Sequence, residues 1–384
     1  MDAPLVIVGT GMAAYGLLRA LRHLDPRSPV MLIGADDAVA YSKFELPRAL
    51  ARGQEAGQLV VATPEQMAYR FGATIRPHCR VHGIDRGRRV LVTDSGEQPY
   101  SRLVLAVGAD AERPAQLRGT AANRLLTVAC LAEYAYLRSE LAGRRRIVVL
   151  GGGISGCELA DNLVRGGFAV TLLEPGNRLL ADSFPQLCAE RVANALRASG
   201  VRVRCDDGLQ RLDPAGADLD ALTLSGQHLV VEVAVAALGN RPRTALALAA
   251  GLDVGCGVRV DARLQSSDPA IYALGECAEL AGRVLTQPDE IEACAHALAG
   301  VLHGASAGVR AQPRLRRLQI ECCPAAVCMP PPAVAGEWHE TARARGVRAL
   351  FHDCNGRLQG FALVGETTGE AHRLLAVAGQ GRRH

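Results

Sequence analysis

Aromatic residues are scarce in this chain, where Phe, Trp and Tyr together make up 4% of 384 residues. Ala, Gly, Leu, Val and Arg dominate instead, and this bias is typical of a tightly wound α/β protein rather than a β-sandwich. The sequence also lacks an aromatic-plus-basic ribbon and a recognition-helix pattern, so we expect no nucleic-acid partner. Hydrophobic residues still make up 49% of the chain, which predicts folded domains rather than disorder.

Long apolar runs are absent as well. No segment reaches the roughly 18 consecutive apolar residues that a membrane-spanning helix needs. The apolar stretch from Leu5 to Leu21 is interrupted by glycines and preceded by Asp2 rather than by a basic residue, unlike a signal peptide. These features predict a cytoplasmic protein with no membrane partner.

Cysteines are present but lack the spacing of a disulfide framework. Twelve of them are scattered along the chain without a CxxC pair, so we expect buried free thiols in a reducing compartment. Residues that could ligate a metal gather near the C-terminus: Cys322, Cys323, Cys328, His339, His352 and Cys354. Adjacent cysteines cannot easily share one tetrahedral site, so we predict no bound metal.

Two segments of the chain follow the same pattern of strand, glycine-rich turn and helix. The pattern first appears in PLVIVGTGMAAYGLLRALRHL and is repeated in RRRIVVLGGGISGCELADNLVRGG, with first glycines at positions 9 and 151. Each β-branched run before the glycines predicts a buried parallel strand. Further apolar strands follow in VMLIGADD and AVTLLEPG, so the chain contains a duplicated βαβ unit.

The first glycine motif reads Gly9-Thr10-Gly11-Met12-Ala13-Ala14, of the form GxGxxA. In this motif the first glycine permits a tight turn, the second allows close approach of a pyrophosphate, and the third small residue lets the helix pack on the strand. The N-terminus of the following helix offers N–H groups and a positive dipole to the phosphates. Asp36, at the end of the next strand, is positioned to accept hydrogen bonds from ribose hydroxyls.

The second motif contains Gly151, Gly153, Ile154 and Gly156, and Glu174 ends the strand that follows. A carboxylate at that position binds a ribose 2′-hydroxyl and repels a 2′-phosphate, so we predict NADH rather than NADPH. Two such cradles imply two dinucleotides, one a resident cofactor and the other a substrate. Glu158, just after the motif, has two open interpretations: a residue lining the space between the nucleotides, or an acid favoured by the helix dipole.

The rest of the chain completes three predicted domains. From about residue 312 the composition becomes Pro-rich, then VRALFHDCNGRLQGFALVG indicates a β-hairpin with Asn355-Gly356 as its turn, and a last helix follows from Glu370 to Ala378. The predicted fold is α/β, with two Rossmann-like dinucleotide-binding domains and a small C-terminal α+β domain. The expected boundaries are 1–112 and 241–311 for the domain of the first cradle, which the resemblance described next implies to be the FAD-binding domain, 113–240 for the NAD-binding domain, and 312–384 for the C-terminal domain.

These motifs together resemble the FAD-dependent pyridine nucleotide-disulfide oxidoreductases, and among them the rubredoxin–NAD reductases. The matching segments run along nearly the whole chain and include YSK at residues 41–43, RVHGID, LVLAVGA, ALGNRPRTALALAAGL, IYALGECAE and the final FALVG. The resemblance implies that FAD binds along the first cradle, with Lys43 near the isoalloxazine and the Val81 backbone near the adenine. It further implies that the chain crosses into the NAD domain at Gly108 and returns at Gly239. Gly275 and Glu276 would meet the ribityl and phosphate region of FAD, and Glu158 would lie near the nicotinamide.

The resemblance also implies a mechanism in which NADH gives a hydride to the flavin. That step needs no acid–base side chain, so we assign no catalytic residue. Disulfide-reducing relatives carry a cysteine near the position of Tyr41, but residues 41–50 contain none here. The electrons are therefore expected to leave for an external carrier, rubredoxin or a similar small acidic protein. Two arginine clusters are candidates to receive it, with a solvated surface as the alternative for each: Arg314, Arg316 and Arg317, and Arg343, Arg345 and Arg348.

Three positions depart from the family pattern. Glu276 stands where relatives carry Asp, and acids occur in the stretch from Thr286 to Glu292 where an apolar run is usual. A lysine near the flavin has no counterpart in the stretch from Gln319 to Cys323. Added acids and a lost cation disfavour an anionic reduced flavin, which predicts a lowered reduction potential or a weakened FAD site. The alternatives are therefore a reductase of another carrier such as flavorubredoxin or ferredoxin, an NADH oxidase, and a non-catalytic scaffold with a drifted FAD site.

Overall fold

The computed structural model describes residues 3–309, 314–331 and 333–380. The chain divides into two compact units. Unit one comprises Met1–Lys43, Ala56–Asp110 and Asn240–Arg310, and unit two comprises Phe44–Glu55, Ala111–Gly239 and Ala311–His384. The assignment of the chain to an FAD-binding, an NAD-binding and a C-terminal domain with the boundaries given above stays a prediction.

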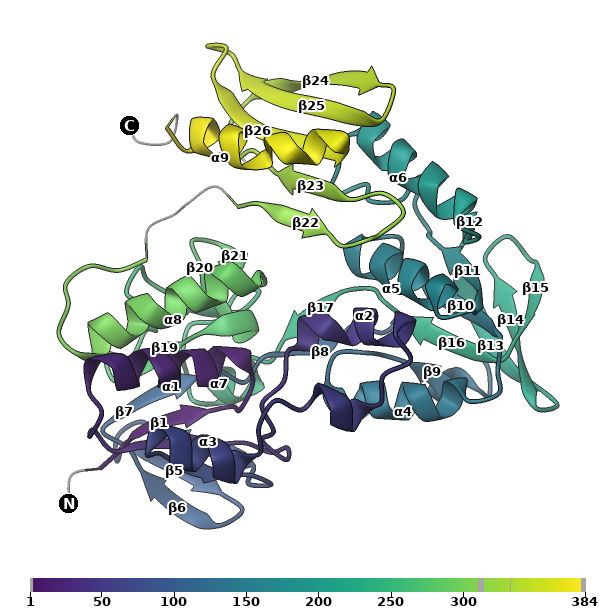
Figure 1. The fold of residues 1–384 in the computed structure, drawn as a ribbon. Helices are drawn as coiled ribbons and strands as arrows, with labels where there is room; N and C mark the ends of the chain where they lie inside the picture. The colour runs from purple at the N-terminus through teal and green to yellow at the C-terminus, as the bar shows by residue number, and fades with distance from the viewer. Residues whose placement is uncertain (1–2, 310–313, 332, 381–384) are drawn as a thin grey trace. The chain divides into compact units, whose positions relative to one another are not determined.

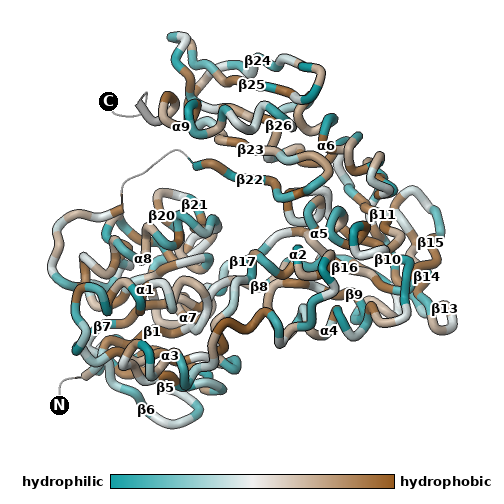
Figure 2. The backbone as a smooth tube through the Cα atoms, in the orientation of Figure 1, coloured by the Kyte–Doolittle hydropathy of each residue, from teal (hydrophilic) through white to brown (hydrophobic). Residues whose placement is uncertain are grey.

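Unit one is built on a parallel sheet in the strand order β19-β7-β1-β2-β3. Its strands are β1 (Leu5–Val8), β2 (Val30–Ile33), β3 (Thr74–Arg76), β7 (Arg102–Leu105) and β19 (Ile271–Ala273). Every residue of β2 and β19 is buried, which explains why these strands are continuous apolar runs rather than alternating ones. Figure 2 shows β1 in the brown of hydrophobic residues.

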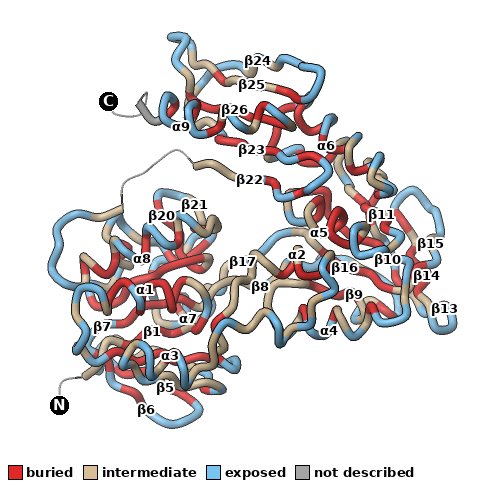
Figure 3. Tube along the Cα trace, viewed as in Figure 1, coloured by how far each residue is buried: buried red, intermediate tan, exposed pale blue. Residues whose placement is uncertain are grey.

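Helices cover this sheet. They are α1 (Met12–Leu24), α3 (Pro64–Phe71), α7 (Ala245–Ala249) and α8 (Pro288–Leu302). α1 and α8 lie side by side (Figure 1), and small residues let them approach, since a Cβ built on Gly16 would be 3.7 Å from the Cβ of Ala295. Figure 3 shows the resulting core as buried segments in α1 and α8. α3 begins with a capping box between Thr63 and Gln66.

Short antiparallel and mixed sheets complete unit one. One contains β4 (Val81–Asp85), β5 (Val90–Thr93) and β6 (Gly96–Pro99), and the other contains β18 (Val258–Val260), β20 (Ala278–Leu280) and β21 (Arg283–Val284). β8 (Ala109–Ala111) pairs with β17 (Asn240–Pro242) where the chain leaves unit one and returns to it. The chain therefore makes unit one from segments that are distant in sequence.

Unit two contains the second parallel sheet, in the order β12-β11-β10-β16-β9. Its strands are β9 (Leu125–Leu126), β10 (Arg146–Leu150), β11 (Ala169–Leu173), β12 (Arg202–Arg204) and β16 (Val233–Ala236). The helices of this part are α2 (Leu46–Ala51), α4 (Leu131–Leu141), α5 (Ile154–Arg165) and α6 (Gln186–Ala198). An antiparallel meander follows in β13 (Leu209–Ala215), β14 (Asp218–Thr223) and β15 (His228–Val231). The predicted duplication of the βαβ unit is confirmed by these two sheets.

The C-terminal part of unit two is an antiparallel sheet in the order β22-β23-β26-β25-β24. Its strands are β22 (Arg316–Leu318), β23 (Ala325–Cys328), β24 (Gly336–Arg343), β25 (Gly346–Asp353) and β26 (Leu358–Gly365). The predicted hairpin around Asn355-Gly356 is confirmed as the β25–β26 pair. The last helix, α9 (Ala371–Gln380), begins one residue later than expected, because Glu370 belongs to a preceding 3₁₀ turn.

Three further observations concern the cysteines, metal-binding groups and membrane-spanning helices. All twelve cysteines are free thiols. Across the described ranges, no group of three or more His, Cys, Asp or Glu side chains is placed to hold a metal ion. Among the helices of these ranges, none combines the length and apolar character needed to cross a bilayer.

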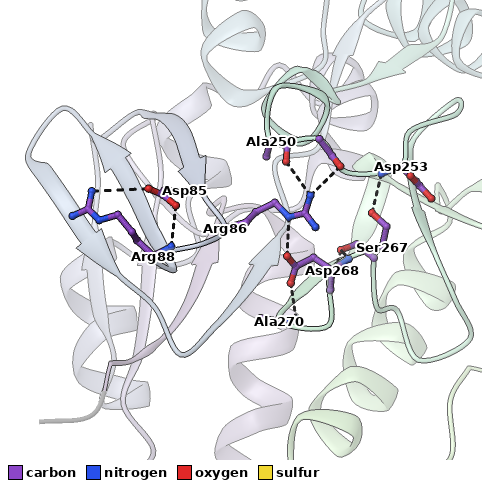
Figure 4. A network of polar contacts seen from close by, with 10 residues as sticks. Asp85, Arg86, Arg88, Ala250, Asp253, Ser267, Asp268 and Ala270 are labelled. Carbon is purple, nitrogen blue, oxygen red and sulfur yellow. Dashed lines mark hydrogen bonds and ion pairs between the residues drawn. The ribbon is translucent and has the colours of Figure 1, made fainter.

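A network around Arg86 ties the distant segments of unit one together (Figure 4). The Arg86 side chain follows β4 and donates through Nε to Asp268 Oδ2 at 2.8 Å, and through Nη1 to the carbonyls of Ala250 and Gly251 at 3.3 and 3.1 Å. Asp268 also accepts the Ala270 N–H at 2.9 Å. Burial alone would raise the pKa of Asp268, but the hydrogen bonds from Arg86 and Ala270 outweigh it and lower that pKa below its usual value.

We predict that Arg86→Ala lowers the free energy of unfolding by about 1 kcal/mol, a value reduced for solvent screening because the guanidinium is partly exposed. The stabilisation is present above the ordinary pKa of an Asp and is lost as the pH falls through the lowered folded-state pKa of Asp268. The loss caused by Arg86→Ala should therefore shrink below about pH 4. Urea unfolding at several pH values measures it, with Arg88→Ala in the exposed Arg88–Glu97 pair as the control that should matter less.

Candidate dinucleotide-binding sites

The turn after β1 can be made only by glycine at its first position. Gly9 has a φ of +123°, and a Cβ built on it would lie 2.2 Å from the carbonyl oxygen of Ala106, which follows β7. Any larger residue would therefore clash with backbone as well as strain the left-handed conformation. The turn delivers the chain directly to the start of α1, as the sequence pattern predicts.

The N-terminus of α1 is open. Gly11 is the N-cap residue and makes no side-chain capping hydrogen bond, and a Cβ built on it would meet nothing within 4 Å. The first turn, beginning with Met12 and Ala13, contains no acidic residue. Ala14 is fully buried, so the helix packs closely on the sheet. An N-terminus with space in front of it and no competing acid fits the pyrophosphate of FAD.

Asp36 lies beside this cradle. The Thr10 hydroxyl donates to Asp36 Oδ1 at 2.5 Å, and the Ala38 N–H donates to the same oxygen at 3.2 Å. Gly34 permits this approach, because a Cβ there would be 2.6 Å from the Thr10 side chain. Asp36 is exposed, so its carboxylate is held by the protein on one oxygen and open to solvent. The arrangement suits a hydrogen bond to a ribose hydroxyl.

A second group of residues, from the last segment of unit one, lies beside the start of α1. Gly275 has a φ of +78°, and a Cβ on it would lie 2.8 Å from the Cβ of Ala13. The adjacent Glu276 forms an ion pair with Lys43 and accepts a hydrogen bond from Asn240 Nδ2 at 3.3 Å. The Lys43 and Glu276 side chains are 26% and 12% exposed. The sequence singled out Lys43 and Glu276 but gave no signal that they are partners, and it missed Asn240.

The structure also describes three residues singled out for their backbone. We expect Val81 to contact the cofactor, and Gly108 and Gly239 to mark where the chain passes between the FAD and NAD domains. Val81 begins β4 and is half-buried. Gly108 has a φ of +72°, and its carbonyl accepts the Arg243 N–H at 3.0 Å. Gly239, in unit two, has a φ of +109°, and its carbonyl accepts the Glu112 N–H at 2.9 Å. Their roles toward the nucleotides stay predictions.

The acids at the start of α8 differ from one another in their surroundings. Asp289 and Glu292 are exposed, whereas Glu290 is half-buried and pairs with Arg283 at 3.3 Å between Nη2 and Oε1. Burial lowers the pKa of Arg283. The sequence did not single out Arg283, which brings a cation to the acids that we expected to face the flavin.

The second cradle repeats the geometry of the first on β10 and α5. Gly151 has a φ of +101°, and a Cβ on it would be 2.7 Å from the carbonyl oxygen of Ala237. Gly153 is the N-cap before Ile154, with no side-chain cap and nothing within 4 Å of a built Cβ. Gly156 is more restricted, since its Cβ would lie 1.7 Å from the Gly151 carbonyl oxygen. The three glycines therefore serve the turn, the open approach and the helix–strand packing that the motif requires.

Glu174 is fixed at the edge of this cradle by backbone donors. Its Oε2 accepts the Gly152 N–H at 2.6 Å, and its Oε1 accepts the Gly176 N–H at 2.7 Å. Arg178 is directed elsewhere, because it donates to the carbonyls of Phe184 and Ala181, both at 3.0 Å. A fixed carboxylate and an arginine already engaged with carbonyls favour a 2′-hydroxyl over a 2′-phosphate.

Glu158 on α5 contacts the chain that enters the C-terminal sheet. Its Oε1 accepts the Gln319 N–H at 2.7 Å, and burial raises the pKa of Glu158. Burial has the opposite effect on the cation Arg316, whose pKa it lowers. The Arg316 guanidinium interacts with the Glu158 carboxylate. Glu158 therefore has a protein partner that neither sequence interpretation included, and its role toward a nucleotide stays a prediction.

The same face of α5 holds the segment where relatives carry the missing lysine. Asp161 is 1% exposed, and its Oδ2 accepts the Glu321 N–H at 3.1 Å. The Glu321 side chain pairs with Arg165 on α5. The acid in this segment is thus compensated by an arginine of the same unit.

Known proteins resemble this chain along its whole length. The family model of the pyridine nucleotide-disulphide oxidoreductases matches residues 3–300, and the model of a rubredoxin binding C-terminal domain matches residues 319–377. The rubredoxin-NAD(+) reductase of Alcanivorax borkumensis is 37% identical over 373 residues, covering 97% of each chain. The nitric oxide reductase FlRd-NAD(+) reductase of Aeromonas hydrophila is 36% identical over 372 residues, covering 97% of this chain and 95% of that protein.

Solved structures agree on the fold. A putidaredoxin reductase–putidaredoxin complex matches with a TM-score of 0.87 at 22% identity, covering 98% of this chain and 94% of that one. An NAD-dependent persulfide reductase from A. fulgidus matches with a TM-score of 0.91 at 21% identity, covering 98% of this chain and 77% of that one. The predicted fold class, α/β with two Rossmann-like domains and a small C-terminal α+β domain, is confirmed.

The space at the two N-caps allows a prediction in which one variant affects FAD binding and the other affects NADH binding. Gly11→Val and Gly153→Val each add bulk where the protein has space, so both should fold. Gly11→Val should lose FAD, with occupancy reduced roughly tenfold or more, because the side chain fills the pyrophosphate position. Gly153→Val should stay yellow but raise the KM for NADH to a similar degree. Visible absorbance and steady-state kinetics measure the two effects, and loss of FAD from Gly153→Val alone would contradict the assignment of the cradles.

A second prediction concerns the charge of Glu276. Glu276→Gln removes a carboxylate from the cluster beside α1 and releases Lys43, so a reduced cofactor carrying more negative charge should become easier to form. We expect the reduction potential of bound FAD to rise, by about 30 mV if the two-electron equilibrium shifts tenfold. Titration against a reference dye measures it, with Glu97→Gln in the exposed pair with Arg88 as the control. An unchanged or lower potential in Glu276→Gln would show that this carboxylate does not oppose reduction.

Proposed function

The chain belongs to the pyridine nucleotide-disulphide oxidoreductase family, and on that premise we propose that it carries electrons from NADH, through FAD, to rubredoxin. It is an FAD-dependent NADH oxidoreductase with a rubredoxin-binding type of C-terminal domain. The observation that carries the choice of acceptor is this second match, at residues 319–377, in a chain that has no disulfide. We also propose that the protein works in the cytoplasm.

The proposed electron path needs two nucleotide sites, one for FAD and one for NADH. When bound, FAD supplies the chemistry that takes a hydride from NADH and releases single electrons. The chain's residues bind and orient: we expect Gly11 and the N-terminus of α1 to hold the FAD pyrophosphate, and Gly153 with α5 to hold that of NADH. We expect Glu174 to select the 2′-hydroxyl of NADH, because both its oxygens are already fixed by backbone N–H groups.

Cys277 and Cys294, two thiols of unit one, are unsuited to redox relay. Cys277 follows Glu276 directly, but it is fully buried and donates to the Leu105 carbonyl at 3.2 Å. Burial raises the pKa of the Cys277 thiol and of the Cys294 thiol, so both stay protonated and unreactive near neutral pH. An external acceptor therefore remains the outlet for the electrons.

A reductase of another carrier stays an alternative, because a nitric oxide reductase FlRd-NAD(+) reductase is 36% identical to this chain. Two alternatives without a protein acceptor also have a specific basis. A water-forming NADH oxidase from Lactobacillus brevis shares the fold, with a TM-score of 0.87 at 17% identity. A scaffold with a drifted FAD site was suggested by the unmatched acids, but the open N-cap at Gly11 and the pairing of Glu276 with Lys43 support a site that still fits FAD. Of the two, we therefore regard the oxidase as the alternative to separate by experiment.

The test is the anaerobic addition of NADH to the purified protein, followed by oxidised rubredoxin. We expect a yellow protein that bleaches with NADH, bleaches far more slowly with NADPH, and regains its colour when rubredoxin is added. A colourless protein that takes up no FAD would support the scaffold. Recovery of colour with oxygen but not with rubredoxin would support the oxidase.

A further inference from the structure

A groove of about 470 Å³ lies in the C-terminal part of unit two, between the β25–β26 hairpin and α9. Its apolar lining includes Leu350 on β25 with Leu374 and Val377 on α9, and its polar lining includes Arg348, His352 and Arg357. These residues all lie within the segment matched by the rubredoxin binding domain model.

The groove exists because α9 covers only part of one face of the sheet. Along β25, Val347, Ala349 and Phe351 are buried on the face that contacts α6, whereas the alternate residues at 348, 350 and 352 are only half-buried. α9 packs mainly on β26, where Phe361 and Leu363 are completely buried. In Figure 3 the outer strand β24 is largely exposed while β26 is buried. The β25 side of this face is therefore left partly open.

α9 turns an apolar side chain toward this opening. Leu374 and Val377 are three residues apart, so they share one face of the helix. Leu374 is 6% exposed and contributes to the core, but Val377 is 47% exposed at the groove. Val377 therefore adds an apolar edge to the groove that Leu350 and Leu374 also line.

The charge around the groove is positive. Its lining contains Arg348 and Arg357 and no acidic residue. At the adjoining edge Arg343, Arg348 and Arg373 pair with Glu370, and Arg345 pairs with Glu366. Asp353 lies near Arg357, whose backbone N–H it accepts at 2.9 Å, but it is outside the lining. Glu337 lies opposite His352 on β24 but outside the lining. The second arginine cluster named from the sequence thus keeps a net positive charge.

The first arginine cluster has a different environment. Arg316 is directed to Glu158, and Arg317 Nη2 lies 3.2 Å from His372 Nε2. Arg316 is half-buried and Arg317 is exposed on β22. Neither lines the groove, whereas Arg348 of the second cluster does.

We propose that this groove is the docking site of the acidic electron-carrier protein, which inserts an apolar side chain between Leu350 and Val377 and sets carboxylates against Arg348 and Arg357. The proposal rests on the proposed function and adds the place of contact. The groove has room for side chains of a partner, and the residues that contribute most to protein binding commonly fill pockets near the centre of an interface. The surrounding arginines would attract the acidic partner and increase its rate of association.

The test uses two groove variants and two matched controls. Val377→Asp puts a carboxylate into the apolar part, and Arg357→Glu reverses one charge at the rim. Val230→Asp on β15 makes the same substitution at a valine that is 54% exposed, and Arg202→Glu on β12 changes the net charge of the chain by the same amount. All four positions are on the protein surface, so each holoenzyme should fold and retain FAD.

Binding is measured with zinc-substituted rubredoxin, which cannot accept electrons, and turnover with native oxidised rubredoxin. We expect the Kd and the KM for rubredoxin to rise at least tenfold in Val377→Asp and Arg357→Glu, and less than twofold in the controls. Arg357→Glu should also reduce the salt dependence of binding. The rate of NADH-dependent ferricyanide reduction should be unchanged in all four, because ferricyanide needs no docking surface.

Two outcomes would overturn the docking site. Groove variants that behave like their controls would place the carrier elsewhere, while the proposed function would stand as long as the parent protein reduces rubredoxin. A parent protein that is a dimer, and that Val377→Asp converts to a monomer without changing the Kd for rubredoxin, would show that a second copy of the chain covers the groove. Failure of the parent protein to reduce any rubredoxin would instead refute the proposed function.

Discussion

Close approach between a glycine turn and the backbone of a neighbouring strand end is the constraint on which the rest of this structure depends. In both cradles the first glycine lies against a neighbouring carbonyl, at 2.2 Å from a built Cβ for Gly9 and 2.7 Å for Gly151, so the turn cannot accept a side chain. A Cβ built on the second glycine, Gly11 or Gly153, would meet no protein atom within 4 Å, and we expect the ligand to occupy that space. Both turns follow parallel strands that are largely buried, which explains the apolar composition of β1 and β10.

Three acids in the segments that depart from the family pattern are paired within their own units, whereas Asp289 and Glu292 are exposed. Glu276 pairs with Lys43, Glu290 with Arg283, and Glu321 with Arg165. Each pair places a cation beside the carboxylate. The added negative charge is therefore largely cancelled for groups that lie further away. A site in the course of decay would be expected to accumulate unpaired charges, which are costly when partly buried. The pairing therefore argues that these substitutions adjust the electrostatics of a retained site.

The sequence predicted those features that depend on local patterns. Strand, glycine turn and helix follow from β-branched runs and small residues, and the β25–β26 hairpin follows from Asn355-Gly356. The pairing of Lys43 with Glu276 spans 233 residues, and that of Glu158 with Gln319 spans 161, so no local pattern could reveal either. The half-covered face of β25 was equally hidden, because alternation along a strand shows which residues share a face but not what packs on it.

The partly uncovered C-terminal sheet differs from the two parallel sheets in a way that matches their different roles. Central strands of the two parallel sheets, such as β2 and β16, are buried on both faces, as nucleotide binding at their ends requires a rigid support. The antiparallel sheet instead keeps a basic, partly apolar face open beside α9. Val377 stays half-exposed at the edge of that groove, so the open face carries apolar as well as cationic side chains. Rigid support at the cradles and an open face at the C-terminal sheet together suit a protein whose nucleotides bind inside and whose acceptor is another protein.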